Sequence, residues 1–226
     1  MTRLTLGGAE LVADPVGALW WPDERMLLVA DLHLEKGTSF ARRGTLLPPW
    51  DTRATLDRLD AALTRYGPEV VVALGDSFHD REARARLGAE DAARLAALTA
   101  RCDWRFLAGN HDPGGTEEAF EHRGIVFRHE AAPGAAPEVS GHYHPKATIR
   151  VHGRAVACRC FVTDGRRLIM PAFGAYAGGL DVRDPAIADW FPDGFTAWLA
   201  GTRRLTAVPS SLLGVRPAAG EPAFAF

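Results

Sequence analysis

The sequence predicts an α/β protein in which two mixed β-sheets pack face to face with helices outside them. In the first half of the chain, short apolar segments alternate with helix-like segments, which is typical of parallel strands joined by helices. In the second half, strand-like segments are separated by tight turns, which is typical of antiparallel hairpins. A parallel half and an antiparallel half in one chain together favour two mixed sheets.

The parallel half depends on three apolar segments, each followed directly by polar residues. Their unbroken apolar character indicates strands that are buried on both faces. One helix is expected between the first two strands, from Asp51 as N-cap to Gly67, and a second between the last two, over residues 89–100. The strands are expected at residues 26–30, 70–74 and 105–108. Leucines at helical spacing mark the buried helix faces: Leu56, Leu59, Leu63, Leu95 and Leu98.

The antiparallel half contains strand-like segments joined by turn residues around Gly153 and Gly165. Before it, residues 116–123 are predicted as a helix and residues 124–128 as a strand. The hairpin strands are expected at residues 147–151, 155–162 and 167–170. Because the chain has no internal repeat or long linker, we expect a single domain over residues 1–213 and a loosely ordered tail over residues 214–226.

The composition excludes several classes of protein. The chain has 226 residues, of which 47% are hydrophobic, and a formal net charge of −2. Its apolar runs fall far short of the roughly 18–20 residues that cross a bilayer, and its first residues lack the apolar block of a signal peptide. The three cysteines lack paired spacing. We therefore expect a cytoplasmic protein without a membrane segment, and one that does not hold nucleic acid by bulk positive charge.

The basic residues are unevenly divided. Only Lys36 and Lys146 are lysines among the 26 basic residues. A preference for arginine codons explains the ratio, but it does not explain why both lysines lie beside the polar motifs described next.

Four short segments concentrate residues that can bind metal ions. They are Asp31-x-His33, Gly75-Asp76, Gly109-Asn110-His111-Asp112 and Gly141-His142-Tyr143-His144. Three of them follow predicted strands directly, and ligands of α/β sheets bind beyond the carboxyl ends of the strands. Carboxylate, amide and imidazole donors together suit a transition metal such as Mn, Fe or Zn.

These four segments, in this order, resemble the pattern of the calcineurin-like metallophosphoesterase family over about residues 26–180. The resemblance implies a four-layer αββα sandwich of two mixed sheets and a pair of divalent transition-metal ions, with Mn²⁺ expected and Fe or Zn as alternatives. The flanking residues are similar to a bacterial, ligase-associated branch known as PdeM. That branch implies a Mn-dependent DNA phosphodiesterase or endonuclease, associated with a DNA ligase, a helicase and an exonuclease in DNA repair. The flanks are residues 31–37, 75–80, 141–146 and 171–181.

The resemblance also implies a set of metal ligands. Asp76 is expected to bridge both ions, since a carboxylate has two anionic oxygens. One further histidine is needed, and we favour His129, which follows a predicted strand, over His122, which falls in the predicted helix. The expected ligands of one ion are Asp31, His33 and His144, and those of the other are Asn110, His129 and His142.

Two residues are candidates for catalysis beside the metals. His111 is expected to give a proton to the leaving oxygen or to stabilise charge in the transition state. Asp112 either orients His111 or only forms a turn before Pro113. His79 stands where much of the family has aspartate, and it either faces the substrate, supports a ligand, or is a turn histidine.

The charge of the expected site favours a phosphodiester substrate. Two divalent ions and the carboxylates of Asp31 and Asp76 leave a local charge near +2, or +1 with a bridging hydroxide as the nucleophile. We expect the substrate to be DNA, in single-stranded form. Aromatic residues that either stack on bases or pack in the core are Phe40, Trp50 and Phe78. Expected substrate-binding residues are Lys36, Arg42, Arg43, His79 and Lys146, with Arg81, Arg84 and Arg86 nearby in the sequence.

Two other functions remain open from the sequence. The same site chemistry suits a small-nucleotide phosphodiesterase or a pyrophosphatase. A non-catalytic scaffold on the same fold is the third hypothesis, which the complete set of ligand types and the presence of His111 disfavour.

Overall fold

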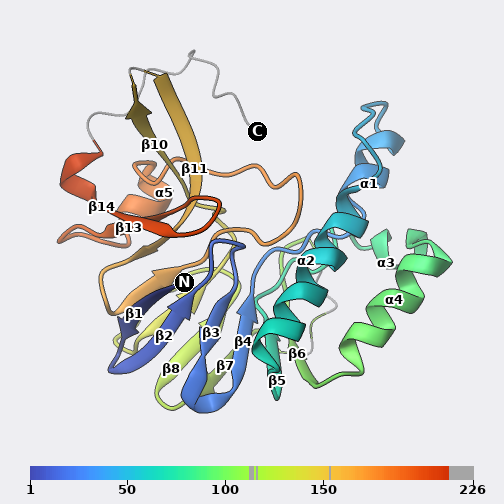
Figure 1. Cartoon of the computed structure of the whole chain (residues 1–226), viewed down its shortest axis with the longest axis horizontal. Coiled ribbons are helices and arrows are strands. Elements are labelled where there is room, and N and C mark those ends of the chain that lie inside the picture. Colours follow the sequence, from blue (N-terminus) through green and yellow to red (C-terminus); the bar gives the residue numbers. More distant parts are fainter. Residues whose placement is uncertain (112–114, 116, 153, 214–226) are drawn as a thin grey trace.

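The structure of the protein, a computed structural model, describes residues 1–213 apart from 112–114, 116 and 153. Asp112 and the predicted tail therefore lie outside the described residues. The described chain contains two mixed sheets with helices, which confirms the predicted α/β class (Figure 1).

The first sheet has six strands in the order β1-β2-β3-β4-β5-β6. Strands β1 to β4 are antiparallel neighbours, whereas β4, β5 and β6 are parallel. The parallel strands confirm the first two predicted segments, and the third starts two residues earlier than expected. The strands are β1 (Thr2–Leu6), β2 (Ala9–Ala13), β3 (Leu19–Trp21), β4 (Met26–Val29), β5 (Val70–Ala73) and β6 (Asp103–Phe106).

The second sheet has the strand order β14-β13-β11-β12-β9-β8-β7, with β10 paired to β11. Its β8, β9 and β12 strands are parallel neighbours, and the other pairs are antiparallel. The predicted hairpins are confirmed. The strands are β7 (Ala119–His122), β8 (Ile125–Arg128), β9 (Glu138–Ser140), β10 (Lys146–Val151), β11 (Arg154–Thr163), β12 (Arg167–Ile169), β13 (Thr196–Ala200) and β14 (Leu205–Pro209).

The helices α1 to α4 gather on one side of the molecule, and the β10–β11 hairpin extends beyond the body of the second sheet (Figure 1). None of the helices in the described part of the chain has both the length and the apolar composition to cross a membrane. The helices are α1 (Lys36–Arg42), α2 (Asp51–Tyr66), α3 (Ala83–Arg86), α4 (Ala89–Thr99) and α5 (Pro185–Ala188), with 3₁₀ turns η1 (Pro22–Glu24) and η2 (Ser210–Leu212).

Three apolar clusters separate the four layers. The first contains Leu28 and Phe161 and fills the space between the two sheets. The second joins the first sheet to α2 and α4, and the third joins the second sheet to α5. The outer layer over the second sheet is thin, since α5 is its only regular helix among the described residues. The buried leucines of α2 confirm the predicted helix face: Leu56, Leu59 and Leu63.

Two local predictions are wrong. Residues 119–122, predicted as part of a helix, form strand β7, because they pair along their whole length with β8. Asp51, predicted as the N-cap of α2, is instead its first residue, after Trp50. The carboxylate of Asp51 accepts a hydrogen bond from the backbone N–H of Gly37 at 2.9 Å, so it ties α2 to α1.

Candidate metal centre

The polar motifs follow strands that are parallel within each sheet, and their loops meet at one place. Strands β4, β5 and β6 of the first sheet and β8 and β9 of the second lead into these loops. Backbone hydrogen bonds join the loops, including His33 N–H to Asp76 O at 2.9 Å and Asp31 N–H to Gly75 O at 3.3 Å. The side chains brought together in this way are Asp31, His33, Asp76, Asn110, His129, His142 and His144.

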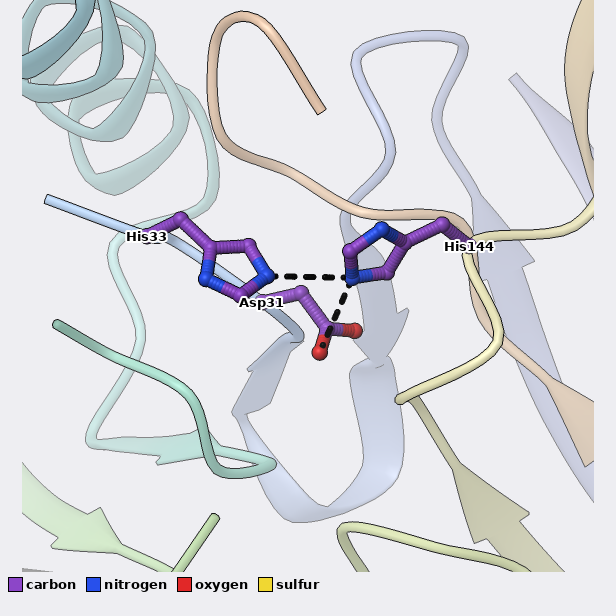
Figure 2. A group of neighbouring side chains, drawn as sticks. All are labelled: Asp31, His33 and His144. Atoms are coloured by element: carbon purple, nitrogen blue, oxygen red, sulfur yellow. Dashed lines mark hydrogen bonds and ion pairs between the residues drawn. The ribbon is translucent and has the colours of Figure 1, made fainter. Parts of the chain in front are cut away.

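Asp31, His33 and His144 form the first group of donors (Figure 2). The Nε2 atoms of His33 and His144 are 3.1 Å apart, and Nε2 of His144 is 3.3 Å from Oδ1 of Asp31. Asp31 and His33 are buried, while His144 is partly exposed. The three donors therefore converge on one point at the edge of the solvent.

Asn110, His129 and His142 form the second group. Oδ1 of Asn110 lies 2.8 Å from Nε2 of His129 and 3.1 Å from Nδ1 of His142, and the two ring nitrogens are 3.1 Å apart. Nδ1 of His129 is 2.8 Å from the carbonyl oxygen of Leu74. Donation of the Nδ1 proton to that carbonyl leaves the Nε2 lone pair of His129 directed at the group.

Asp76 lies between the two groups. Its Oδ2 is 3.9 Å from Nε2 of His33 and 3.5 Å from Nε2 of His129. Its Oδ1 accepts a hydrogen bond from the backbone N–H of His111 at 2.9 Å, which fixes the carboxylate. This is the position that a ligand shared by two cations requires.

His122, the alternative to His129, lies elsewhere. It is on β7, where Nε2 is 2.5 Å from Oε2 of Glu24 and the ring packs edge-on against Trp21. The structure thus places His129, and not His122, beside Asp76.

The backbone at the centre has an uncommon conformation. Among the described non-glycine residues, ten have positive φ, and five of these belong to the two groups and Asp76. Such residues are rare and are maintained only where the surrounding structure over-determines them, often at functional sites. The five are Asp31, His33, Asp76, His142 and His144.

Two glycines of the motifs allow the acidic residues to approach the neighbouring loops. A Cβ on Gly109 would lie 2.1 Å from Oδ1 of Asp76, and one on Gly141 would lie 2.6 Å from Oδ2 of Asp31. Any side chain at either position would displace a carboxylate.

Ionisation at the centre suits metal binding. Burial raises the pKa of Asp31. The neighbouring histidines His144, His129 and His33 lower it by a larger total amount, so the pKa lies below its ordinary value. Burial lowers the pKa of His33 to about 3 and shifts the pKa of His142 in the same direction. At neutral pH, Asp31 is an anion, and His33 and His142 are neutral, which are the forms that ligate metals.

The donor set fits divalent transition metals. Nitrogen and oxygen lone pairs converge in the two groups, and Asp31, Asp76 and His129 also lie close enough together to hold an ion. No lysine or arginine forms an ion pair with Asp31 or Asp76 among the described residues. Two buried carboxyl groups surrounded by imidazoles, with no basic side chain paired to them, favour a cation, and imidazole with carboxylate suits Mn, Fe and Zn.

Residues 24–179 match the calcineurin-like phosphoesterase family. The chain belongs to this family. A solved structure, the nuclease MPE of Pseudomonas putida, shares 30% sequence identity with a TM-score of 0.70, and the match covers 91% of this chain and 99% of that chain.

Two more distant structures also match this metallophosphoesterase. The phosphoesterase Yfce of E. coli is 13% identical with a TM-score of 0.41, covering 81% of this chain and 97% of its own. A Vps29 mutant of Entamoeba histolytica is 16% identical with a TM-score of 0.35, and the match covers 81% of this chain and 98% of that chain. No curated protein sequence matches the chain.

His111 lies on the solvent side of the metallophosphoesterase centre. Its ring stacks on His79, with centroids 5.2 Å apart, and meets His33 edge-on at 5.4 Å. Its exposure and its backbone bond to Asp76 place an imidazole beside the donors without adding it to either group.

His79 is buried between this ring, Phe40 and His33. Its Nδ1 is 3.4 Å from Nδ1 of His33, the nitrogen that faces away from the donor group. Burial lowers the pKa of His79 to about 4, so the ring is neutral and can accept the His33 proton. Of the roles predicted for His79, this contact favours support of a ligand histidine.

The predicted substrate-binding cations differ in their surroundings. Lys36 opens α1 and lies over the ring of Phe40, with Nζ 5.7 Å from the centroid. Arg42 forms an ion pair with Glu82, so its charge is already partnered. Arg43 is exposed and Lys146 half-buried, and neither forms an ion pair in the described part of the chain.

The three aromatic residues that were candidates for base stacking differ in their exposure to solvent. Phe78 is buried in the cluster under α2 and α4, so the core interpretation is correct for it. Phe40 packs on His79 at 5.7 Å. Trp50 is 60% exposed, so it alone of the three presents most of its ring to solvent.

Glu35, for which the sequence predicted no role, is buried beside Lys36. Its carboxylate accepts hydrogen bonds from the hydroxyls of Thr52 at 2.9 Å and Thr38 at 2.7 Å, and its backbone N–H donates to Thr52 at 2.9 Å. These contacts hold the first turn of α1, and with it Lys36, against α2. In the sequence, Glu35 could have been singled out because its carboxylate directly precedes Lys36 next to the Asp31-x-His33 motif.

Proposed function

We propose that this metallophosphoesterase is a Mn-dependent endonuclease that cleaves phosphodiester bonds in single-stranded DNA. The observation that carries the proposal is the position of Asp76 between two donor groups. A pair of divalent ions there would attract an anionic diester. The similarity to a nuclease at 30% identity over 91% of the chain supports DNA as the polymer.

Different residues of the chain would bind the metal ions and transfer the proton during hydrolysis. Asp31, His33 and His144 would hold one ion, Asn110, His129 and His142 the other, and Asp76 both. The ions, when bound, polarise phosphate oxygens and lower the pKa of water, so that hydroxide is available at neutral pH. His111 gives a proton to the leaving oxygen, because its ring is exposed beside the donors. Asp112, next to it in sequence, would orient that ring.

A comparison of substrates tests the proposal. With Mn²⁺ added, the protein should cleave circular single-stranded DNA, which has no ends, and should hydrolyse bis-p-nitrophenyl phosphate. Duplex DNA should be cleaved more slowly, and EDTA should stop all three reactions. Hydrolysis of cyclic nucleotides or pyrophosphate-linked nucleotides without DNA cleavage would instead establish a small-nucleotide enzyme. No hydrolysis of any ester would indicate a scaffold.

We place this activity in the cytoplasm and in DNA repair, together with a ligase, a helicase and an exonuclease. All three cysteines are unpaired in the structure, which suits a reducing compartment. A neighbouring set of ligase and helicase genes would support the association, and purification of the proteins as one complex would test it directly.

Replacement of both lysines near the centre should weaken DNA cleavage. Burial lowers the pKa of Lys36, and nearby Lys146 lowers it as well, so the two lysines lie close together and can contact the phosphates that flank the scissile one. We expect Lys36→Ala with Lys146→Ala to raise KM for DNA more than it lowers kcat. The salt dependence of KM should flatten by about 1.4 in logarithmic slope, since two single-strand contacts are lost.

The matched control removes two arginines at the other end of the sheet. Arg25 and Arg101 are ion-paired with Glu69 and Asp60 and precede β4 and β6, so they lie away from the centre. Arg25→Gln with Arg101→Gln changes net charge equally and should leave the salt slope intact. An unchanged KM and slope in the lysine variant would show that the lysines do not contact DNA.

A further inference from the structure

Arg58 on α2 and Arg159 on β11 are half-buried, and neither forms an ion pair with a carboxylate in the described part of the chain. Each makes one described side-chain hydrogen bond, to a backbone carbonyl: Arg58 to Phe173 and Arg159 to Pro15, both at 3.2 Å. The five other half-buried arginines of the described chain all form ion pairs with carboxylates, so the absence of one at these two positions stands out. A carbonyl bond satisfies a donor but does not neutralise the charge, and the carboxylate that acts on Arg159, Asp14, is already paired with Arg65.

These two arginines continue from the lysines at the metal centre. Lys146 and Arg159 are directly opposite each other in the β10–β11 pair, so their side chains leave the same face of the hairpin. Burial lowers the pKa of Arg159, and nearby Arg58 lowers it as well. Lys146 lies near Lys36 in the same sense, since it lowers the pKa of that lysine. We call this set, Lys36, Lys146, Arg159 and Arg58, the cationic row.

Like charges side by side are unfavourable for the protein alone. Opposite like charges on paired strands destabilise a sheet, and burial increases the repulsion. Among the described residues, no member of the cationic row forms an ion pair, which would relieve it. A polyanion lying along the row would supply the missing charge.

The row also borders an open region of the surface. Arg159 lines a hollow of about 610 Å³ together with Arg65 and Arg203. Arg65 is paired with Asp14, whereas Arg203 is exposed and forms no ion pair in the described chain. A single strand of DNA that follows the cationic row can therefore leave the protein past Arg159.

An exposed aromatic ring lies on the segment that spans the row. Arg58 binds the carbonyl of Phe173 at the start of this segment, and the backbone N–H of Lys146 donates to Leu180 at its end, at 2.8 Å. Figure 1 shows the segment, in orange, reaching from the second sheet toward α1 and α2. Between these anchors, Tyr176 is 43% exposed and has a φ of +59°, a conformation rare for a tyrosine.

We propose that the cationic row and Tyr176 bind a stretch of single-stranded DNA that extends several nucleotides from the cleaved phosphate. Cations that follow a backbone, combined with an exposed ring on which an unpaired base stacks, are the two elements of single-strand binding. The inference rests on the proposed nuclease function and adds the path of the strand. Arg58 and Arg159 lie beyond the lysines, so only a polymer would reach them.

Direct binding measurements test the path without depending on cleavage. We would measure fluorescence anisotropy of labelled oligothymidylates of about 4 and about 16 nucleotides, in EDTA, over a range of salt. Arg58→Gln with Arg159→Gln should weaken binding of the longer oligonucleotide about 20-fold at 0.1 M salt and reduce the salt slope by about 1.4. Tyr176→Ala should weaken it about fivefold or more. The shorter oligonucleotide should respond less to both changes.

Three comparisons decide the outcome. The Arg25→Gln, Arg101→Gln variant removes the same charge and should bind like the unaltered protein; equal weakening in it would overturn the path in favour of bulk charge. Arg58→Lys with Arg159→Lys keeps the charges and should keep the salt slope. Loss of the slope in the lysine variant would show that the arginines act only through their carbonyl bonds. A blunt duplex that binds as tightly as the single strand would overturn the single-strand assignment.

Failure of the path and failure of the proposed function give different results. If Mn²⁺-dependent DNA cleavage is seen but the arginine variants bind normally, the nuclease function stands and the path is wrong. If the chain binds long oligonucleotides through the row but cleaves none, the path stands and the nuclease function is wrong.

Discussion

Asp76→Ala is expected to abolish hydrolysis and to release both metal ions together. Oδ2 of Asp76 is 3.9 Å from Nε2 of His33 in one donor group and 3.5 Å from Nε2 of His129 in the other. In the proposed two-metal site, removal of the shared carboxylate would take one ligand from each ion and would remove a negative group that offsets the repulsion between the ions. Since bound ions would provide several kcal/mol of transition-state stabilisation, activity should fall by about 10³-fold or more.

Elemental analysis of the purified variant after dialysis measures the metal content. Asp76→Asn keeps the shape and one neutral oxygen, so it should keep the fold and lose most of the metal. Asp14→Asn is the matched control, because Asp14 is also buried but bonds Arg65 and Tyr66 away from the centre. It should retain full metal content. Two tightly bound ions in Asp76→Ala would exclude a bridging role for this residue.

The sequence predicted the part of the fold in which burial determines residue type. Strands β4 and β5 are buried along nearly their whole length, so they are continuously apolar and easily recognised. Strands β1 and β2 are buried on one face only, and their mixed composition gave no comparable signal. Residues 119–122 follow two glutamates, which are good helix formers, but pairing with β8 outweighs that local preference.

The motifs also predicted which residues would meet. Asp31, Asp76 and Asn110 each follow a parallel strand, and the carboxyl ends of such strands share one edge. The choice of His129 over His122 depended on a strand before His129, and β8 is that strand. Strand order thus explains why these donors meet, whereas the full ligand set came from the resemblance of the motifs to the family.

Partners that are distant in sequence could not be predicted. Arg42 was expected to face substrate, but Glu82, 40 residues later, neutralises it. Arg58 and Arg159 lie on different elements, α2 and β11, with no motif around either, and only the folded structure brings them close enough for Arg58 to lower the pKa of Arg159. Charge pairing of this kind depends on tertiary contacts, which a single sequence does not contain.

His111→Ala should keep its metals yet lose most of its activity on DNA. The ring of His111 lies 5.4 Å from that of His33, but His111 belongs to neither donor group. Under the proposed function, its loss would therefore remove a proton donor and no ligand. General acid catalysis contributes about 10²–10⁴-fold, so DNA cleavage should fall within that range because its leaving alkoxide needs a proton.

Bis-p-nitrophenyl phosphate separates this role from others, because p-nitrophenolate leaves readily without a proton. The loss of kcat on that ester should be about tenfold or less. His152→Ala is the control, since His152 is an exposed histidine at the β10–β11 turn and should change neither rate. Equal losses on both substrates would show that His111 stabilises charge on the phosphate instead of protonating the leaving group. Loss of metal from the variant would show that His111 is a ligand, because removal of a proton donor that contacts neither ion should not weaken metal binding.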